Sequence, residues 1–448
     1  MEAKAFSSLS KDSSGAYLIA SVNDFYYFRN TVNDGNNGAG KTFKLMCDLS
    51  FGGAEIKPVQ NTFSGTFDGN FHQMSDYELT EGTEYWAGTL GKLGLFCVLS
   101  GATIKNLTLR GYVDGRSGTN KYVTKWIGGF AGYAENTNFI FCTNHGTIER
   151  GLAIGGIVGR IDSGSIEKCS NYGDVRAHYS IRENFEYDTY CGGIAGISYI
   201  TVKNSFNVGN IGYIGYDGEN AIVLNIHGKA HYYGGISGYC TQTISGCYNA
   251  GTIMESYLPL LVQATKDKTE GIWFLSETYT YHAIVWIFQP TFSNINGYLG
   301  DSSNSMPSVS NCYGTQTAPH IQKTMTLYFY CQPQHGTGIG EGWLDISGDD
   351  QTKDIEYSKW YARFSYVKNE KTIYYSIYSD KKYSQKEAGG SKNISYIFRT
   401  NYTAITISKL KSSNSGLDSN VWAYDKYINN GYPHFKDMYW KNNPVKPS

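Results

Sequence analysis

The acidic residues Glu186 and Asp217 are the catalytic candidates that this sequence offers. Each lies in a segment of variable length between two copies of a repeated motif, and neighbouring copies of a stacked strand repeat lie about 4.8 Å apart. Glycoside hydrolysis uses two carboxyl groups about 5 to 10 Å apart, so this pair has suitable spacing for it. Other acidic loops would share this property, and nothing in the spacing distinguishes these two. We therefore expect a binding function, with catalysis as the alternative.

The same variable segments are rich in aromatic rings, carboxylates and histidines. Sugars have CH faces that stack on rings and hydroxyl groups that bond to acids and amides. Binding residues concentrate on loops carried by a rigid scaffold, so the pattern predicts a glycan-binding edge. The alternative is a set of solvated loops in which tyrosine fills gaps. The candidate ligand-binding residues are Tyr179, Glu183, Tyr187, Tyr216, Asp217, His227 and Trp273.

No cofactor or metal site is expected from the motifs. His227 and His231 are four residues apart, but neither an HExxH motif nor a third clustered ligand accompanies them. The formal net charge is −1, from 38 basic and 39 acidic residues, so no overall field favours nucleic acid. The apolar runs are too short to span a bilayer, so we expect no transmembrane segment. Any partner must be recognised locally.

A two-part repeat organises the middle of the chain. The motif GGφxG, in which φ is apolar, begins at Gly128, Gly155, Gly192 and Gly234. It lacks the Lys-Ser/Thr pair and the following helix of a phosphate-binding loop. Each copy is followed, 15 or 16 residues later, by the asparagine of a CxNxGxI motif, with serine replacing cysteine once. The spacing between successive asparagines grows from 27 to 36 and 42 residues, so insertions enter each unit at one place.

The fixed half of each unit alternates apolar and polar residues over short runs bounded by glycine, which is typical of strands. Short strands joined by sharp turns once per repeat predict a parallel β-solenoid. Stacking would place like residues on top of one another, giving an amide ladder and an interior column of thiols, with all insertions along one edge. The predicted ladder and column residues are Asn144, Asn171, Asn207, Asn249, Cys142, Cys169 and Cys247.

Several of these motifs resemble those of GLUG-repeat proteins from bacterial, often gut-dwelling, cell surfaces. They are the segment at 63–72, the Gly-Leu-Phe element at 94–96, the two repeated motifs, and the closing segment from Trp422 to Pro433. The resemblance covers residues 10–255 well and 400–440 moderately, and it implies a right-handed parallel β-helix in an adhesin or large secreted protein. The shared residues are scaffold residues, so they imply fold and location rather than activity. Residues 254–400 fit the repeat poorly, and no export signal is visible.

The chain divides into five predicted regions. A short helix is expected within the first of them, and a β-hairpin at 360–378 within the fourth. The regions are an N-terminal cap with initial strands (1–60), β-helix coils (61–255), an aromatic insertion with a decayed coil (256–310), a hairpin-rich insertion (311–400) and a closing element (401–448).

The sequence therefore predicts an all-β protein, a right-handed parallel β-helix with N- and C-terminal caps and inserted loops and hairpins. We expect an extracellular or surface-displayed, adhesin-like protein that binds a glycan or a host surface. One alternative is a polysaccharide-degrading β-helix enzyme, either a lyase or a glycoside hydrolase. Another is a protein like a viral tail spike, which would need a trimer interface.

Overall fold

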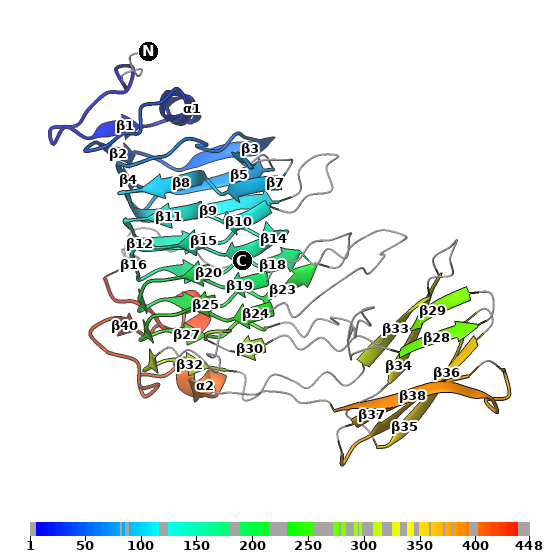
Figure 1. Ribbon diagram of the computed structural model, residues 1–448. Helices are drawn as coiled ribbons and strands as arrows, with labels where there is room; N and C mark the ends of the chain where they lie inside the picture. The colour runs from blue at the N-terminus through cyan, green and yellow to red at the C-terminus, as the bar shows by residue number, and fades with distance from the viewer. Residues whose placement is uncertain are drawn as a thin grey trace.

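The protein is all-β, as predicted, and most of the described residues lie in strands. Figure 1 shows a stack of strands with a smaller group of strands at one side. The computed structural model describes residues 6–80, 83–85, 89–115, 124–178, 189–214, 231–253, 272–276, 279–283, 291–293, 295–297, 308–315, 325–331, 338–344, 349–357, 360–370, 372–378, 380–393 and 402–437.

The largest sheet, sheet A, is parallel throughout its described pairs (Figure 1). Its short strands form ladders in which each repeat unit pairs with the next. The long strand β9 (Thr103–Asp114) pairs with two earlier and two later strands of the chain. The strands of sheet A are β1 (Tyr17–Ile19), β2 (Thr42–Leu45), β3 (Leu49–Glu55), β4 (Thr66–Asp68), β5 (Gln73–Leu79), β9 (Thr103–Asp114), β12 (Thr137–Asn144), β13 (Ile148–Glu149), β16 (Gly164–Glu167), β17 (Ser170–Asn171), β18 (Val175–His178), β21 (Val202–Lys203), β22 (Phe206–Asn207), β23 (Ile211–Ile214), β26 (Ile244–Ser245), β27 (Tyr248–Asn249), β31 (Val309–Ser310), β32 (Tyr313–Gly314) and β39 (Thr403–Ala404).

Two further sheets complete each unit. Sheet B is parallel and consists of β8 (Phe96–Ser100), β11 (Ala131–Glu135), β15 (Val158–Ile161), β20 (Ala195–Ser198) and β25 (Ser237–Cys240). Sheet C is parallel except for its first pair, and consists of β6 (Thr83–Tyr85), β7 (Thr89–Leu93), β10 (Thr124–Gly128), β14 (Gly151–Gly155), β19 (Thr189–Gly192), β24 (His231–Gly234) and β30 (Thr291–Ser293). Along the chain, a unit runs from sheet C through the GGφxG corner to sheet B and then to sheet A.

The glycines of GGφxG provide space at that corner. A Cβ atom added to Gly132 would lie 2.6 Å from the backbone nitrogen of Leu93, and one on Gly159 would lie 2.4 Å from that of Ile127. Neither Gly132 nor Gly159 is among the residues with positive φ, so the need is for close approach and not for an unusual backbone conformation. The motif therefore marks the place where sheets B and C come into backbone contact.

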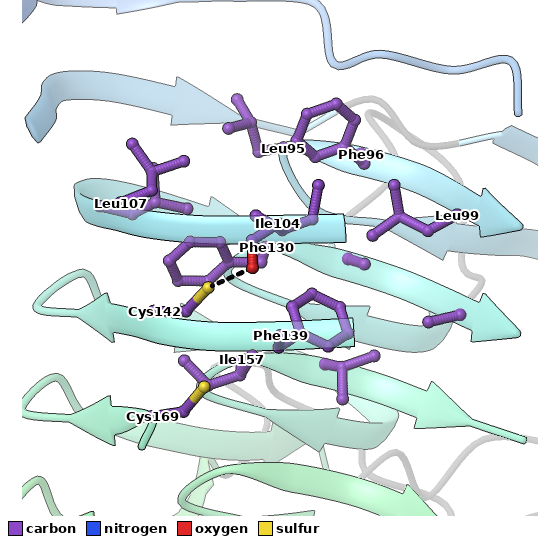
Figure 2. Close-up of a cluster of buried hydrophobic side chains, with 14 of the residues drawn as sticks. Leu95, Phe96, Leu99, Ile104, Leu107, Phe130, Phe139, Cys142, Ile157 and Cys169 are labelled. Atoms are coloured by element: carbon purple, nitrogen blue, oxygen red, sulfur yellow. Dashed lines mark hydrogen bonds between the residues drawn. The ribbon is translucent and has the colours of Figure 1, made fainter. Parts of the chain in front are cut away.

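Apolar side chains from sheets A and B and from the GGφxG corner fill the interior (Figure 2). Phe96, Phe130 and Phe139 are fully buried there. Burial of such large side chains is the main favourable contribution to folding, at about 25 cal/mol for each Å² of apolar surface removed from water.

The four predicted asparagines form a continuous ladder inside the stack. They are at most 1% exposed. Each donates one Nδ2 hydrogen to the carbonyl of the glycine two residues later. The bonds between units are Asn144 Nδ2 to Asn171 Oδ1 (2.8 Å), Asn171 Nδ2 to Asn207 Oδ1 (2.7 Å) and Asn207 Nδ2 to Asn249 Oδ1 (2.8 Å). The ladder thereby satisfies polar groups that would be costly to bury unpaired.

The predicted thiols also stack in the interior. Cys142, Cys169 and Cys247 are buried free thiols, and Cys312 extends the column. Ser205 occupies the position between Cys169 and Cys247: its Oγ accepts a bond from the Cys169 amide (3.2 Å), and its own amide donates to Cys247 Sγ (3.4 Å). Cys142 Sγ donates to the Ile104 carbonyl at 3.3 Å, the dashed line in Figure 2.

The predicted helix near the N-terminus is present as α1 (Val22–Asn33) and lies at the N-terminal end of the stack (Figure 1). Ser21 caps it by accepting a hydrogen bond from the Asp24 amide, at 3.1 Å. Two of its own residues, Phe25 and Phe28, are fully buried on the face that packs against the stack. The Phe28 ring contacts the rings of Phe43, Phe63, Phe67 and Phe96. The helix thus covers the N-terminal end of the interior with aromatic side chains.

Residues 402–437, the C-terminal segment, lie along sheet A. This segment contains β40 (Trp422–Ala423), β41 (His434–Phe435), the short helix α2 (Ile407–Leu410) and the 3₁₀ turn η2 (Asn429–Gly431). The Trp422 ring lies 5.3 Å from that of Tyr248, and the Phe435 ring lies 5.4 Å from that of Phe206. We call the part of sheet A that this segment buries the covered face.

The remaining strands are antiparallel and lie to one side of the stack (Figure 1). The predicted hairpin at 360–378 is confirmed, because β36 pairs with β37. These strands are β28 (Ile272–Ser276), β29 (Tyr279–Ala283), β33 (Met325–Cys331), β34 (Gly338–Leu344), β35 (Gln351–Tyr357), β36 (Trp360–Val367), β37 (Thr372–Tyr378) and β38 (Lys386–Asn393).

Candidate ligand-binding surface

Most residues predicted to bind or react lie outside the described part of the chain. Trp273 is in β28, opposite His282 of β29, and its side chain is not described. The remaining predicted residues lie outside the described part of the chain; they are Tyr179, Glu183, Glu186, Tyr187, Tyr216, Asp217 and His227.

The strands that flank the insertions place their ends at one corner of the stack. The last strands before two insertions, β18 and β23, pair with His178 opposite Ile214. The first strands after them, β19 and β24, pair with Thr189 opposite His231. The insertions therefore start at stacked positions of sheet A and end at stacked positions of sheet C.

Next to this corner, sheets B and C carry a row of half-exposed aromatic and cationic side chains. In sheet C, Trp126 is in register with Lys92, and Tyr190 with Tyr232. In sheet B, Tyr133 is in register with Arg160. We call this surface the aromatic strip, and its residues are Lys92, Trp126, Tyr133, Arg160, Tyr190, Tyr199, Tyr232 and Tyr239.

Rings and cations alternate in the first half of the strip. The Trp126 and Tyr133 rings stack with centroids 5.2 Å apart. The Arg160 guanidinium lies 5.0 Å from the Trp126 ring and 5.1 Å from the Tyr199 ring. Tyr199 is 39% exposed, so this end of the strip is open to solvent. Contacts of this kind are attractive, because the cation interacts with the negative face of the ring.

Two carboxylates border these rings. Arg160 forms a two-point ion pair with Asp162: its Nε donates to Asp162 Oδ1 at 2.7 Å, and its Nη2 donates to Asp162 Oδ2 at 3.2 Å. The single hydrogen of the Tyr133 hydroxyl is shared between Asp162 Oδ2 at 2.9 Å and Glu135 Oε2 at 3.2 Å. Burial raises the pKa of Tyr133, and its bond to Asp162 raises this pKa further, so the phenol stays protonated. Hydroxyl, carboxylate and guanidinium groups thus lie beside two stacked rings.

The second half of the strip is built from tyrosines. Tyr190 and Tyr232 stack at 5.7 Å, and Tyr239 lies 5.4 Å from Tyr190 and 6.0 Å from Tyr232. Tyr190 and Tyr232 are each the second described residue after an insertion. The strip therefore begins where the insertions return to the stack.

Sequence reasoning missed the strip, although a signal was present. The strip residues of sheet C lie two positions before the first glycine of GGφxG; examples are Trp126, Tyr190 and Tyr232. The strip residues of sheet B directly follow the last glycine of the motif; examples are Tyr133 and Arg160. Comparing the residues at a fixed distance from each motif copy would have found them.

A buried ion network ties the strands together at the corner where the insertions start. Glu149 is in register with Asp114 on one side and Arg176 on the other. Arg150 Nη1 lies 2.9 Å from Asp114 Oδ2 and 3.1 Å from Glu149 Oε2, and Arg176 Nη1 lies 3.0 Å from Glu149 Oε1. The Asp114 and Glu149 side chains are only 2% and 7% exposed. Paired and buried carboxylates suit anchoring of the strands rather than attack on a substrate.

The described residues show neither a clustered metal site nor a membrane-spanning helix. They contain no group of three or more His, Cys, Asp or Glu side chains placed to hold a metal ion. Among the described helices, none has the length and apolar character needed to cross a membrane.

Comparison with protein-family models, with curated proteins and with solved structures finds no match to this chain. The resemblance to GLUG-repeat proteins therefore stays a prediction from motifs.

Proposed function

We propose that this protein is an extracellular or surface-displayed, adhesin-like protein that binds glycans, and that its repeat units are the coils of a right-handed parallel β-helix. The parallel ladders of sheets A, B and C support the fold, because each unit pairs in register with the next in all three. The cell-surface location follows from the resemblance of the repeats to GLUG-repeat proteins.

The aromatic strip is the observation that carries the binding proposal. Its rings provide apolar faces for sugar CH groups, and Asp162, Glu135 and Arg160 provide partners for hydroxyl groups. The rings are mounted on strands and contact one another, so little conformational freedom is lost on binding. The strip also adjoins the ends of the insertions, from which the sequence-predicted ligand residues come.

Binding to a panel of immobilised neutral and acidic polysaccharides tests this proposal. Trp126→Ala and Tyr199→Ala should each weaken binding at least tenfold without lowering the melting temperature by more than a few degrees. Tyr427→Ala is the matched control, because Tyr427 is a 76% exposed tyrosine in the C-terminal segment, outside the strip. Unchanged binding in both strip variants would refute the proposed surface.

The same panel tests the enzymatic alternative. Release of shortened chains that disappears in Glu186→Gln or Asp217→Asn, while binding persists, would replace the adhesin-like function with polysaccharide degradation. General acid–base catalysis contributes about 10² to 10⁴ in rate, and an amide cannot transfer the proton.

A further inference from the structure

The ammonium group of Lys92 stands out within the strip because of what surrounds it. Lys92 is in β7, in register with Trp126. Its Nζ lies 4.9 Å from the Tyr133 ring and 5.7 Å from the Trp126 ring. Among the residues that the structure describes, no carboxylate lies within ion-pair distance of it. Lys92 is half-buried, so its charge is partly removed from water, and it lies over the faces of two rings.

A second cation on the same rings, Arg160, has a different environment. Arg160 also lies over Trp126, but Asp162 pairs with it through two bonds. The carboxylate nearest in sequence to Tyr133, that of Glu135, is engaged by the Tyr133 hydroxyl and by Ser100 Oγ at 2.8 Å. Among the described residues, the carboxylates at this end of the strip are therefore engaged by other partners, and none of them pairs directly with Lys92.

Other charged and titratable groups lie near the Lys92 ammonium. Lys125 Nζ lies 4.9 Å from the Trp126 ring, so a second ammonium is close to the same ring. Burial lowers the pKa of Lys92; nearby Cys97 and Glu135 act against this, and Lys125 adds to it. Partial burial disfavours the charged form of Lys92, so an anion that arrives with a ligand would offset this cost by pairing directly with the ammonium group.

We infer that Lys92, Trp126 and Tyr133 form a subsite for the anionic group of an acidic glycan, either a sugar carboxylate or a sulfate ester. The anion pairs with Lys92, and the sugar ring lies against the aromatic side chains. This inference rests on the proposed glycan-binding function and names the class of glycan.

Two pairs of polymers that differ mainly in charge provide the test. Polygalacturonate and its fully methyl-esterified form test the carboxylate, and carrageenan and agarose test the sulfate ester. The wild-type protein should bind the anionic member of at least one pair at least tenfold more tightly, and this preference should weaken as salt is raised.

Variants at Lys92 locate the preference. Lys92→Gln should reduce the preference to less than threefold, and Lys92→Arg should restore most of it. Lys11→Gln is the matched control, because Lys11 Nζ also lies over a tyrosine ring, 4.4 Å from that of Tyr17, outside the strip. It removes the same charge and a similar contact.

The outcomes separate the two proposals. If the wild-type protein binds none of the four polymers and none of the wider panel, the proposed function fails. If it binds both members of each pair equally, glycan binding stands and the acidic class is wrong. A preference that survives in Lys92→Gln, or that Lys11→Gln removes equally, would also overturn this subsite.

Discussion

Two surfaces of the stack carry columns of stacked aromatic rings, and they differ in what lies against them. On the covered face, the rings of Phe206 and Tyr248 stack at 4.9 Å with an angle of 3° between them. On the aromatic strip, Tyr190 and Tyr232 stack at 5.7 Å and 17°. The stacking is similar because in-register parallel strands bring equivalent side chains together. Stacked rings therefore follow from the fold and do not by themselves indicate a ligand.

The surroundings of the rings make the difference. The Tyr248 hydroxyl, on the covered face, donates to the Pro433 carbonyl at 2.6 Å and accepts from Asn429 Nδ2 at 3.1 Å. The polar group of that ring is thus satisfied within the chain. On the strip, Arg160 and Lys92 lie over half-exposed rings. The two surfaces therefore differ in the exposure of their stacked rings and not in the presence of cations, because Lys168 also lies over the Phe141 ring, which contacts Phe435 at the covered face.

The largest expected effect distinguishes the two surfaces by stability. Trp422→Ala should lower the free energy of unfolding by about 3 to 5 kcal/mol, because Trp422 is 2% exposed and covers the rings of Phe206 and Tyr248. Trp126→Ala on the strip should cost about 1 kcal/mol or less, as for a partly exposed side chain. Chemical denaturation measures both. Equal losses would show that the strip is also a packing surface.

The asparagine ladder supports both surfaces, so breaking it should weaken them together. Asn171→Ala should cost roughly 1 to 3 kcal/mol, because it leaves the neighbouring buried amides without partners. Asn138→Ala is the control, since Asn138 is half-buried and its Oδ1 accepts a single side-chain bond, from Ser165 Oγ at 2.7 Å. Thermal melts that show no difference between the two variants would contradict a structural role for the ladder.

Acid should destabilise the protein through a histidine on sheet A near the covered face. The His145 ring stacks on Tyr172 at 4.3 Å, and burial, with Arg110 nearby, lowers the pKa of His145 from 6.5 to about 3. The folded state thus disfavours protonation. The contribution of neutral His145 to the free energy of unfolding is fully present above about pH 6.5. It is lost as the pH falls from there towards 3, by at most about 1.4 kcal/mol per pH unit.

Denaturation between pH 7 and 4 checks this expectation, with His145→Phe as the variant that should flatten the dependence. Burial also lowers the pKa of His434, in the C-terminal segment, so a residual dependence should remain until His434 is replaced too. A pH dependence that is identical in His145→Phe and the wild-type protein would show that His145 does not contribute.

The smallest effect is on reactivity, and it tests the interior between the two surfaces. Burial raises the pKa of the Cys142 thiol well above its usual value, and raises that of Cys191 to about 12. Buried protonated thiols react slowly, so both should resist a bulky maleimide in the folded protein. Cys47 is partly exposed and serves as the internal reference. Labelling of Cys142 as fast as Cys47 in the native protein would contradict a closed interior.

The repeated motifs were enough to predict the interior of the stack. In-register stacking converts sequence periodicity into contact, so an asparagine or cysteine that recurs at a fixed place in the unit must meet its counterpart. Asn144 and Asn171 illustrate this, since their bond joins equivalent positions 27 residues apart. The common edge of the insertions follows from the same periodicity.

The two aromatic surfaces were decided only in the tertiary structure. The bond from Tyr248 to Pro433 spans 185 residues and joins the repeat to a segment that does not repeat, so no periodicity could indicate it. The contact of Trp126 with Arg160 depends on the close approach of sheets B and C at the glycine corner. Which rings become buried and which stay half-exposed depends on where nonrepeating segments pack, and that is set by long-range apolar contacts rather than by local pattern.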